Sequence, residues 1–246
     1  MHKFLNLFLI TVILVSCGNN NVKDNIKLSS LIEPEFSFNH SIIECKLLGE
    51  SSLIDLEFFF SKNIAKYKTI TANKIKLFIL FPENNINVNN FIINIISSID
   101  DESLQTLIEE IKNDSINDIA ECEFIVAKNK GLTVINYQNK NELDYSLIEI
   151  LSCKYNQGYN YGTFQITINR FINHIKKLQI PFSLRYVQNF PNNTNFLWIN
   201  SFHDQSYEKM LIDSWINSGD ASEIKDEFIE NATCIESNVY KSYQLL

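Results

Sequence analysis

The sequence has little of what phosphate-binding loops and nucleic-acid surfaces need. Its six glycines and four prolines are spread through 246 residues, and no two glycines are closer than Gly158 and Gly162. This scarcity leaves little room for a glycine-rich phosphate loop. The 21 basic residues are outnumbered by 29 acidic ones, for a formal net charge of −8, and they form no cluster. Because clustered Lys and Arg bind phosphate backbones, the composition argues against a nucleic-acid partner.

The motifs of several common catalytic and metal sites are also missing. The chain has no GxSxG, HExxH, Walker or GxGxxG motif, and no CxxC pair or Cys/His cluster with zinc-like spacing. Beyond the first residues, the histidines His40, His174 and His203 stand singly. We expect solvated or capping roles for His174 and His203, and haem ligation or acid–base chemistry by either is the alternative. The sequence thus indicates no catalytic residue, no metal and no cofactor.

The amino-terminal segment has the pattern of a secretory signal. Lys3 is followed by an apolar run of roughly a dozen residues, which is too short to span a bilayer. The run ends in LVSC at residues 14–17, which resembles the lipobox of bacterial lipoproteins. The resemblance implies removal of the signal peptide at residues 1–16 and acylation of Cys17, and the Asn- and Ser-rich residues 17–40 would tether the lipid to a folded domain. An ordinary signal peptide followed by a chance cysteine is the alternative.

A lipobox implies an address in the bacterial cell envelope, with the membrane as a partner through the lipid anchor. The folded part would face the periplasm or the cell surface. Gly18 is not the aspartate that holds many lipoproteins at the inner membrane, so the outer membrane is preferred for a cell with two membranes.

Beyond the tether, two halves of the chain carry similar features in the same order. The triplet ECK at residues 44–46 matches SCK at 152–154, and FPENN at 81–85 matches FPNNT at 190–194. Apolar residues with helical spacing also coincide, namely Leu56, Phe60, Ile64 and Tyr67 in the first half and Phe164, Ile168, Ile172 and Ile175 in the second. The preserved order indicates an internal duplication, with unrelated coincidence as the alternative.

Each repeat is predicted to run strand, helix, strand, strand, helix, strand. The first repeat has expected strands at 41–47, 76–81, 91–97 and 122–128, with helices at 52–67 and 101–112. The second has expected strands at 147–153, 183–188, 196–200 and 234–240, with helices at 160–178, 205–217 and 221–231. A βαββαβ unit is the ferredoxin-like arrangement. We therefore predict an α+β fold of two ferredoxin-like repeats, residues 41–130 and 146–246, joined by a linker at 131–145.

Two ferredoxin-like units in succession resemble the dimeric α/β-barrel superfamily, here with both units in one chain. That superfamily includes NIPSNAP-like proteins, antibiotic-biosynthesis-type monooxygenases and chlorite-dismutase-like haem proteins. The carboxy-terminal pattern, with FLWI at residues 196–199 followed by Trp215, Gly219 and Cys234, also resembles uncharacterised bacterial envelope proteins. The resemblance concerns the layout of both halves, and no catalytic motif of a member is matched.

Four cysteines remain after Cys17, two in each predicted repeat. Disulfides form and persist outside the cytosol, and four cysteines allow three pairings. In a βαββαβ sheet the first and fourth strands are antiparallel neighbours. Cys45 and Cys153 lie towards the ends of first strands, and Cys122 and Cys234 open fourth strands. We therefore expect the disulfides Cys45–Cys122 and Cys153–Cys234, with four buried thiols as the alternative.

No residue pattern identifies an activity. Trp198 and Trp215, together with three tyrosines at positions 155, 159 and 161, are expected to pack in the core rather than line a pocket. We expect a lipid-anchored envelope protein that binds a small molecule or another envelope protein. The alternatives are an enzyme of the dimeric α/β-barrel type, acting as a monooxygenase, an isomerase or a haem-dependent enzyme, and a structural lipoprotein. An enclosed pocket with two or more convergent polar side chains would favour the enzyme.

Overall fold

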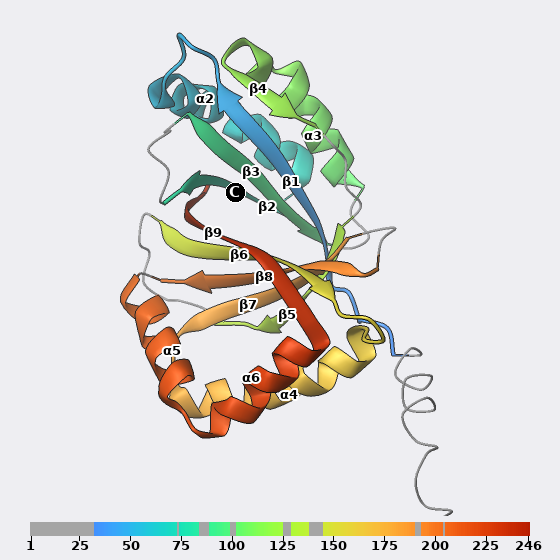
Figure 1. Ribbon diagram of the computed structural model, residues 1–246. Coiled ribbons are helices and arrows are strands. Elements are labelled where there is room, and N and C mark those ends of the chain that lie inside the picture. Colours follow the sequence, from blue (N-terminus) through green and yellow to red (C-terminus); the bar gives the residue numbers. More distant parts are fainter. Residues whose placement is uncertain are drawn as a thin grey trace, which may run out of the picture.

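The structure has four layers, in the order helices, sheet, sheet, helices (Figure 1). It is a computed structural model that describes residues 32–72, 74–83, 89–98, 102–124, 129–137, 145–189, 193–203 and 205–246. Each half of the chain supplies one inner sheet layer and one outer helical layer. No helix in this described part of the chain is both long and apolar enough to cross a membrane.

The first half folds in the predicted order of elements. These are β1 (Phe38–Leu47), α2 (Leu53–Thr71), β2 (Ile75–Pro82), β3 (Asn90–Ser98), α3 (Ser103–Asn113), the short 3-10 helix η1 (Ile116–Asp118) and β4 (Ala120–Glu123). The strands lie side by side as β4, β1, β3 and β2, and all neighbours are antiparallel. This is the strand order of a ferredoxin-like unit.

The second half repeats this arrangement. Its elements are β6 (Ser146–Tyr155), α4 (Tyr161–Leu178), β7 (Phe182–Gln188), β8 (Asn195–Phe202), α5 (Gln205–Asn217), α6 (Asp220–Asn231) and β9 (Ala232–Gln244). Its strands lie in the equivalent order β9, β6, β8 and β7. The prediction of an α+β fold built from two ferredoxin-like units is therefore confirmed.

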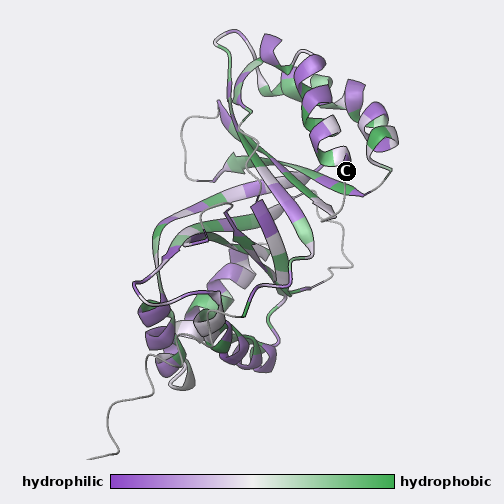
Figure 2. Ribbon diagram, turned by 90° about the vertical axis from the view of Figure 1, so that its right-hand side faces the viewer, coloured by the Kyte–Doolittle hydropathy of each residue, from purple (hydrophilic) through white to green (hydrophobic). Residues whose placement is uncertain are grey.

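Each sheet buries one face against its own helices and the other against the second sheet. Side chains alternate along a strand, so on β1 Ile43 and Cys45 pack under α2 and α3, whereas Phe38 packs between the sheets. On β6, Leu147 and Cys153 likewise pack under α4 to α6. Figure 2 shows the result, since the strands carry long hydrophobic stretches while the helices mix hydrophobic and hydrophilic residues.

A strand that the sequence did not predict closes the sheet. β5 (Asn129–Ile135) pairs with β7 and with the first residues of β1, while β4 pairs with the last residues of β1. On the other side β2 pairs with β9, so the two halves form one continuous closed sheet. The expected linker at 131–145 therefore begins inside a strand, and residues 38–40 of the expected tether belong to β1. This short segment, which contains Gly131, becomes a strand because β1 of the first half and β7 of the second half both offer it an edge to pair with.

Candidate functional site

The helix-facing side of the second sheet carries a charge in an otherwise apolar layer. Glu149 lies on β6 between Leu147 and Leu151, which both pack into the core under the helices. The strand register places Asn200 of β8 directly opposite Glu149. A carboxylate and an amide in this layer need polar partners, because an unpaired buried polar group costs free energy.

Glu149 and Asn200 are joined in a small hydrogen-bond network. Asn200 Nδ2 donates to Glu149 Oε2 over 2.9 Å, and Ser237 Oγ donates to Glu149 Oε1 over 2.8 Å. Both oxygens of the carboxylate are thus held in place. Asn200 is only 9% exposed, and its Oδ1 atom is buried without a hydrogen-bond partner. One acceptor of this network is therefore left free.

Glu149 and Asn200 line a cavity of about 480 Å³ between the second sheet and helices α4, α5 and α6. Most of its wall is aromatic, with Trp198 and Trp215 and the five phenylalanines Phe164, Phe171, Phe196, Phe202 and Phe228. We call this cavity the aromatic pocket. Its volume is in the range of small-molecule sites, and its combination of an apolar wall with a few polar groups is typical of them.

The aromatic walls pack edge to face. Ring centroids are 5.0 Å apart for Phe171 and Trp215, 5.2 Å for Phe164 and Phe228, and 5.5 Å for Trp198 and Phe228. Such contacts hold rings in defined orientations, because the edge of one ring meets the face of the next. The pocket thus has rigid walls that suit a flat, apolar ligand.

A second carboxyl group enters the aromatic pocket from α5. Burial raises the pKa of Glu208 above its ordinary value, and the negative charges of Glu149 and Glu83 raise it further. A carboxyl group with a raised pKa holds its proton nearer to neutral pH and is therefore suited to give and take protons there. Perturbed carboxyl groups of this kind gather at active sites more often than elsewhere.

The lining of the aromatic pocket does not fit a haem. Haem iron takes an axial His, Cys, Met or Tyr, and the described lining offers only Cys153 and Cys234, which are bonded to each other. His174 is buried behind the wall with its ring 5.8 Å from that of Trp215, and His203 lies 6.1 Å from Tyr207. Among the described residues no group of three or more His, Cys, Asp or Glu is placed to hold a metal ion.

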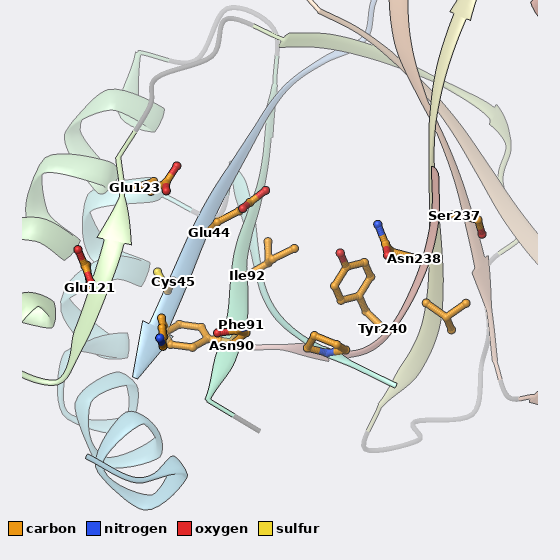
Figure 3. Close-up of a pocket in the computed structure, with 13 residues that line it drawn as sticks. Glu44, Cys45, Asn90, Phe91, Ile92, Glu121, Glu123, Ser237, Asn238 and Tyr240 are labelled. Carbon is orange, nitrogen blue, oxygen red and sulfur yellow. The ribbon is translucent and has the colours of Figure 1, made fainter. Parts of the chain in front are cut away.

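A second cavity lies at one end of the closed sheet (Figure 3). Its volume is about 770 Å³, and Figure 3 shows Glu44, Glu121 and Glu123 on one side with Asn238 and Tyr240 of β9 on the other. All three glutamates are exposed. Exposed carboxylates in water are ordinary surface groups. Tyr240 is partly desolvated, since burial raises its pKa, but the three glutamates of this cavity stay in water.

The structure brings the four cysteines together in pairs. Cys45 and Cys122 are opposite one another on β1 and β4 and are bonded, as are Cys153 and Cys234 on β6 and β9. These are the expected pairings, each joining a first strand to a fourth strand. Cys17 lies outside the described residues.

Sequence reasoning missed the site itself. Trp198 and Trp215 were expected to be packing residues, and they do pack, but they also line the aromatic pocket. The three tyrosines do not line it: Tyr155 and Tyr186 share a hydrogen bond of 2.8 Å between their hydroxyl groups, and Tyr159 donates to Glu230. The available signal was Glu149, a charged residue on the core face of a predicted strand.

Comparison with known proteins identifies the fold. No family model and no curated protein matches the chain. The solved structures that are similar to it include a protein from Lactobacillus acidophilus to which monooxygenase activity is ascribed, with TM-score 0.55, 11% identity, and coverage of 85% of this chain and 95% of that one.

Two other similar structures are described as a chlorite dismutase and a DyP-type peroxidase. A variant of chlorite dismutase from Candidatus Nitrospira defluvii has TM-score 0.54 and 8% identity, with 91% of this chain and 95% of that one covered. A DyP-type peroxidase from Mycobacterium smegmatis has TM-score 0.54 and 5% identity, with coverage of 87% and 94%. At these identities the likeness shows the fold alone, and it agrees with the two ferredoxin-like units of this chain.

The leading functional expectation, a binding or interaction module, is wrong, whereas the lipid anchor stays a prediction. The similar structures are enzymes by their descriptions, and this favours the enzyme alternative. The pocket supports the same alternative. Apolar side chains do not fill the space between the second sheet and its helices, and Glu149, Asn200 and Glu208 converge on one cavity there. Convergent polar groups in a pocket are the feature expected of an enzyme and not of a purely structural protein.

Proposed function

We propose that this protein is an enzyme that oxidises an aromatic substrate with molecular oxygen in the aromatic pocket. The observation that carries the proposal is Glu208, a carboxyl group of raised pKa in a cavity walled by seven aromatic side chains. The monooxygenase activity ascribed to the Lactobacillus acidophilus protein of the same fold supports this reaction class. The proposed reaction takes its electrons from the substrate, so it needs no bound cofactor.

The aromatic walls would hold the substrate ring flat and exclude water. Glu208, ionised, would take a proton from an acidic C–H group of the substrate, as a general base does. The resulting carbanion reduces oxygen by forming a C–O bond, and protonation of the distal oxygen gives a hydroperoxide. Loss of water then leaves a carbonyl group, so CH2 and O2 become C=O and H2O. Water exclusion favours the sequence because it strengthens the interactions that orient the reacting groups.

The fixed network around Glu149 would position the substrate rather than react with it. Asn200 and Ser237 occupy both carboxylate oxygens of Glu149. Such hydrogen bonds hold the carboxylate group in one orientation. Glu208 is not hydrogen-bonded in this network, so it is the carboxyl group free to move a proton.

Oxygen consumption tests the proposal. The assay measures oxygen uptake with a panel of anthrones and dihydroxynaphthalenes, whose ring systems bear acidic hydrogens. We expect uptake by the unmodified protein and a loss of about 100-fold or more in Glu208→Gln, because general-base catalysis contributes factors of that size. Glu223→Gln is the control, since Glu223 is exposed on α6, pairs with Arg170 and lies outside the pocket.

Two results would contradict the proposal. One is full activity in Glu208→Gln, which would show that Glu208 is not the general base. The other is conversion of a substrate without oxygen uptake, which would indicate an isomerase that uses the same proton abstraction.

A further inference from the structure

The strands of the second sheet and helix α5 present hydrogen-bond acceptors to the aromatic pocket. Glu149 accepts hydrogen bonds from Asn200 Nδ2 and Ser237 Oγ. The Nδ2 group of Asn200 therefore already donates within the protein. Asn200 Oδ1 is a buried acceptor without a partner, and Glu208 adds a second carboxyl group to the same cavity. A ligand that fills this part of the pocket must therefore bring donors.

In the part of the chain that the structure describes, neither pocket glutamate forms an ion pair with a basic side chain. The one basic side chain that lines the pocket, Lys225, lies with its Nζ 6.0 Å from the centroid of the Trp215 ring. Partly buried carboxylates in proteins are normally paired with a cation, and two in one cavity make this need stronger.

We infer that the aromatic pocket takes substrates that carry an ammonium group on an aromatic body, with the ammonium group bound by Glu149 and Asn200 Oδ1 and attracted further by the negative charge of Glu208 in the same cavity. An ammonium group has three N–H donors and one positive charge, which match the free amide oxygen of Asn200 and the carboxylate of Glu149. The faces of aromatic side chains also attract cations. The inference names the substrate class of the proposed oxidase, but it concerns binding and is tested without turnover.

Other small aromatic ligands fit this wall less well. A neutral alcohol offers one donor and no charge, so it leaves the carboxyl groups unpaired. An aromatic carboxylate adds a third negative group beside Glu149 and Glu208, and like charges in a poorly hydrated site repel each other. The pocket should therefore rank amine first, alcohol second and acid last.

Tryptophan fluorescence measures this ranking directly. The chain has two tryptophans, Trp198 and Trp215, and both line the aromatic pocket. The probes are 2-phenylethylamine, 2-phenylethanol and 3-phenylpropionate, which share one ring and differ in the end group. We expect the amine to bind at least about tenfold more tightly than the alcohol, as a charge-assisted hydrogen bond is worth about that factor.

Variants locate the binding group. Glu149→Gln keeps the shape of the side chain and should weaken amine binding at least about tenfold, while alcohol binding changes by less than about threefold. Glu236→Gln is the matched control, because Glu236 is an exposed glutamate on β9 outside the pocket. If Glu149→Gln does not fold, as judged by circular dichroism, Glu208→Gln replaces it, since it leaves the network of Asn200 and Ser237 intact.

The outcomes separate this inference from the proposed function. Equal binding of amine and alcohol, or an unchanged amine preference in a folded Glu149→Gln or Glu208→Gln variant, overturns the inference while the oxygen-uptake assay still decides the oxidase. Absence of binding by all three probes to the folded protein also overturns it. Amine preference without oxygen uptake supports the inference and counts against the oxidase alone.

Discussion

The ring of Phe38 on β1 occupies the space where a side chain of Gly131 on β5 would begin. A Cβ atom at Gly131 would overlap this ring and lie 2.9 Å from the carbonyl oxygen of Tyr186. We therefore expect Gly131→Ala to lower the free energy of unfolding by about 2 kcal/mol, the usual cost of overpacking. Urea denaturation measures it, and Gly49→Ala is the control because nothing lies within 4 Å of its Cβ position.

Phe38→Leu should recover part of the loss when it is combined with Gly131→Ala, because a smaller side chain leaves room for the methyl group. Equal stability of the Gly131→Ala and Gly49→Ala variants would contradict the close approach of β1 and β5.

We expect Glu149 and Asn200 to lower the stability of the fold, because they serve the pocket and not the packing of the core. Replacing both by leucine removes two polar groups from an apolar layer, and we expect the free energy of unfolding to rise by about 1–2 kcal/mol. The same double variant should lose the amine preference of the aromatic pocket. Thermal and urea unfolding give the first result and tryptophan fluorescence the second. A double variant that is less stable than the unmodified protein would assign the pair to the fold and not to the site.

His40 should make the protein sensitive to mild acid. It is fully buried between the sheets, with Nε2 2.7 Å from Asn94 Oδ1. Burial lowers its pKa from 6.5 to about 4, and the charge of Arg185 contributes in the same direction. In the unfolded chain His40 is therefore protonated below about pH 6.5. In the folded chain it is protonated only below about pH 4. Stability is therefore lost as the pH falls through that window, by about 3 kcal/mol in total.

Urea denaturation between pH 7.5 and pH 4.5 tests this loss. We expect His40→Gln, which keeps a hydrogen-bonding group for Asn94, to show a smaller decrease over this range than the unmodified protein. His203→Gln is the control, and the comparison cancels the titration of carboxyl groups common to all three proteins. An identical decrease in His40→Gln would show that another group causes the acid sensitivity.

Each disulfide should contribute strongly to stability. Cys45 and Cys122 are 77 residues apart, and Cys153 and Cys234 are 81 apart. Loops of this length restrict the unfolded chain enough to stabilise the folded one by about 4 kcal/mol each. Double replacement by alanine in either pair should lower the free energy of unfolding by that order. Peptide mapping without reduction checks the pairing, and recovery of a Cys45–Cys153 peptide would refute it.

Acylation of Cys17 stays a prediction from the sequence alone. Detergent-extracted protein from its native cell should begin at residue 17 and carry the mass of attached acyl chains, because a lipobox directs cleavage before the cysteine. Intact-mass measurement tests this, and Cys17→Ser should move the protein out of the membrane fraction. An unmodified chain that begins at Met1 would contradict both the anchor and the envelope address.

Local pattern was enough to predict most of the elements. α4 is an example: Asn160 begins it with a capping box to Thr163, and the buried Phe164, Ile168 and Ile175 have helical spacing. The repeated order of such patterns also predicted the two ferredoxin-like units, and their strand order indicated which cysteines would meet. The sequence did not predict β5, because its pattern is short and its partner strands, β1 and β7, come from different halves of the chain.

The sequence by itself determined the elements, their order and the fold class, because hydrophobic periodicity and helix caps act between residues that are close in the chain. Only the tertiary structure decided the site. Asn200 and Ser237 reach Glu149 from 51 and 88 residues away, and the aromatic walls come from three helices and the strands beneath them. Which of these side chains meet depends on strand register and on the packing of helices over the sheet, and both are settled by contacts between distant residues.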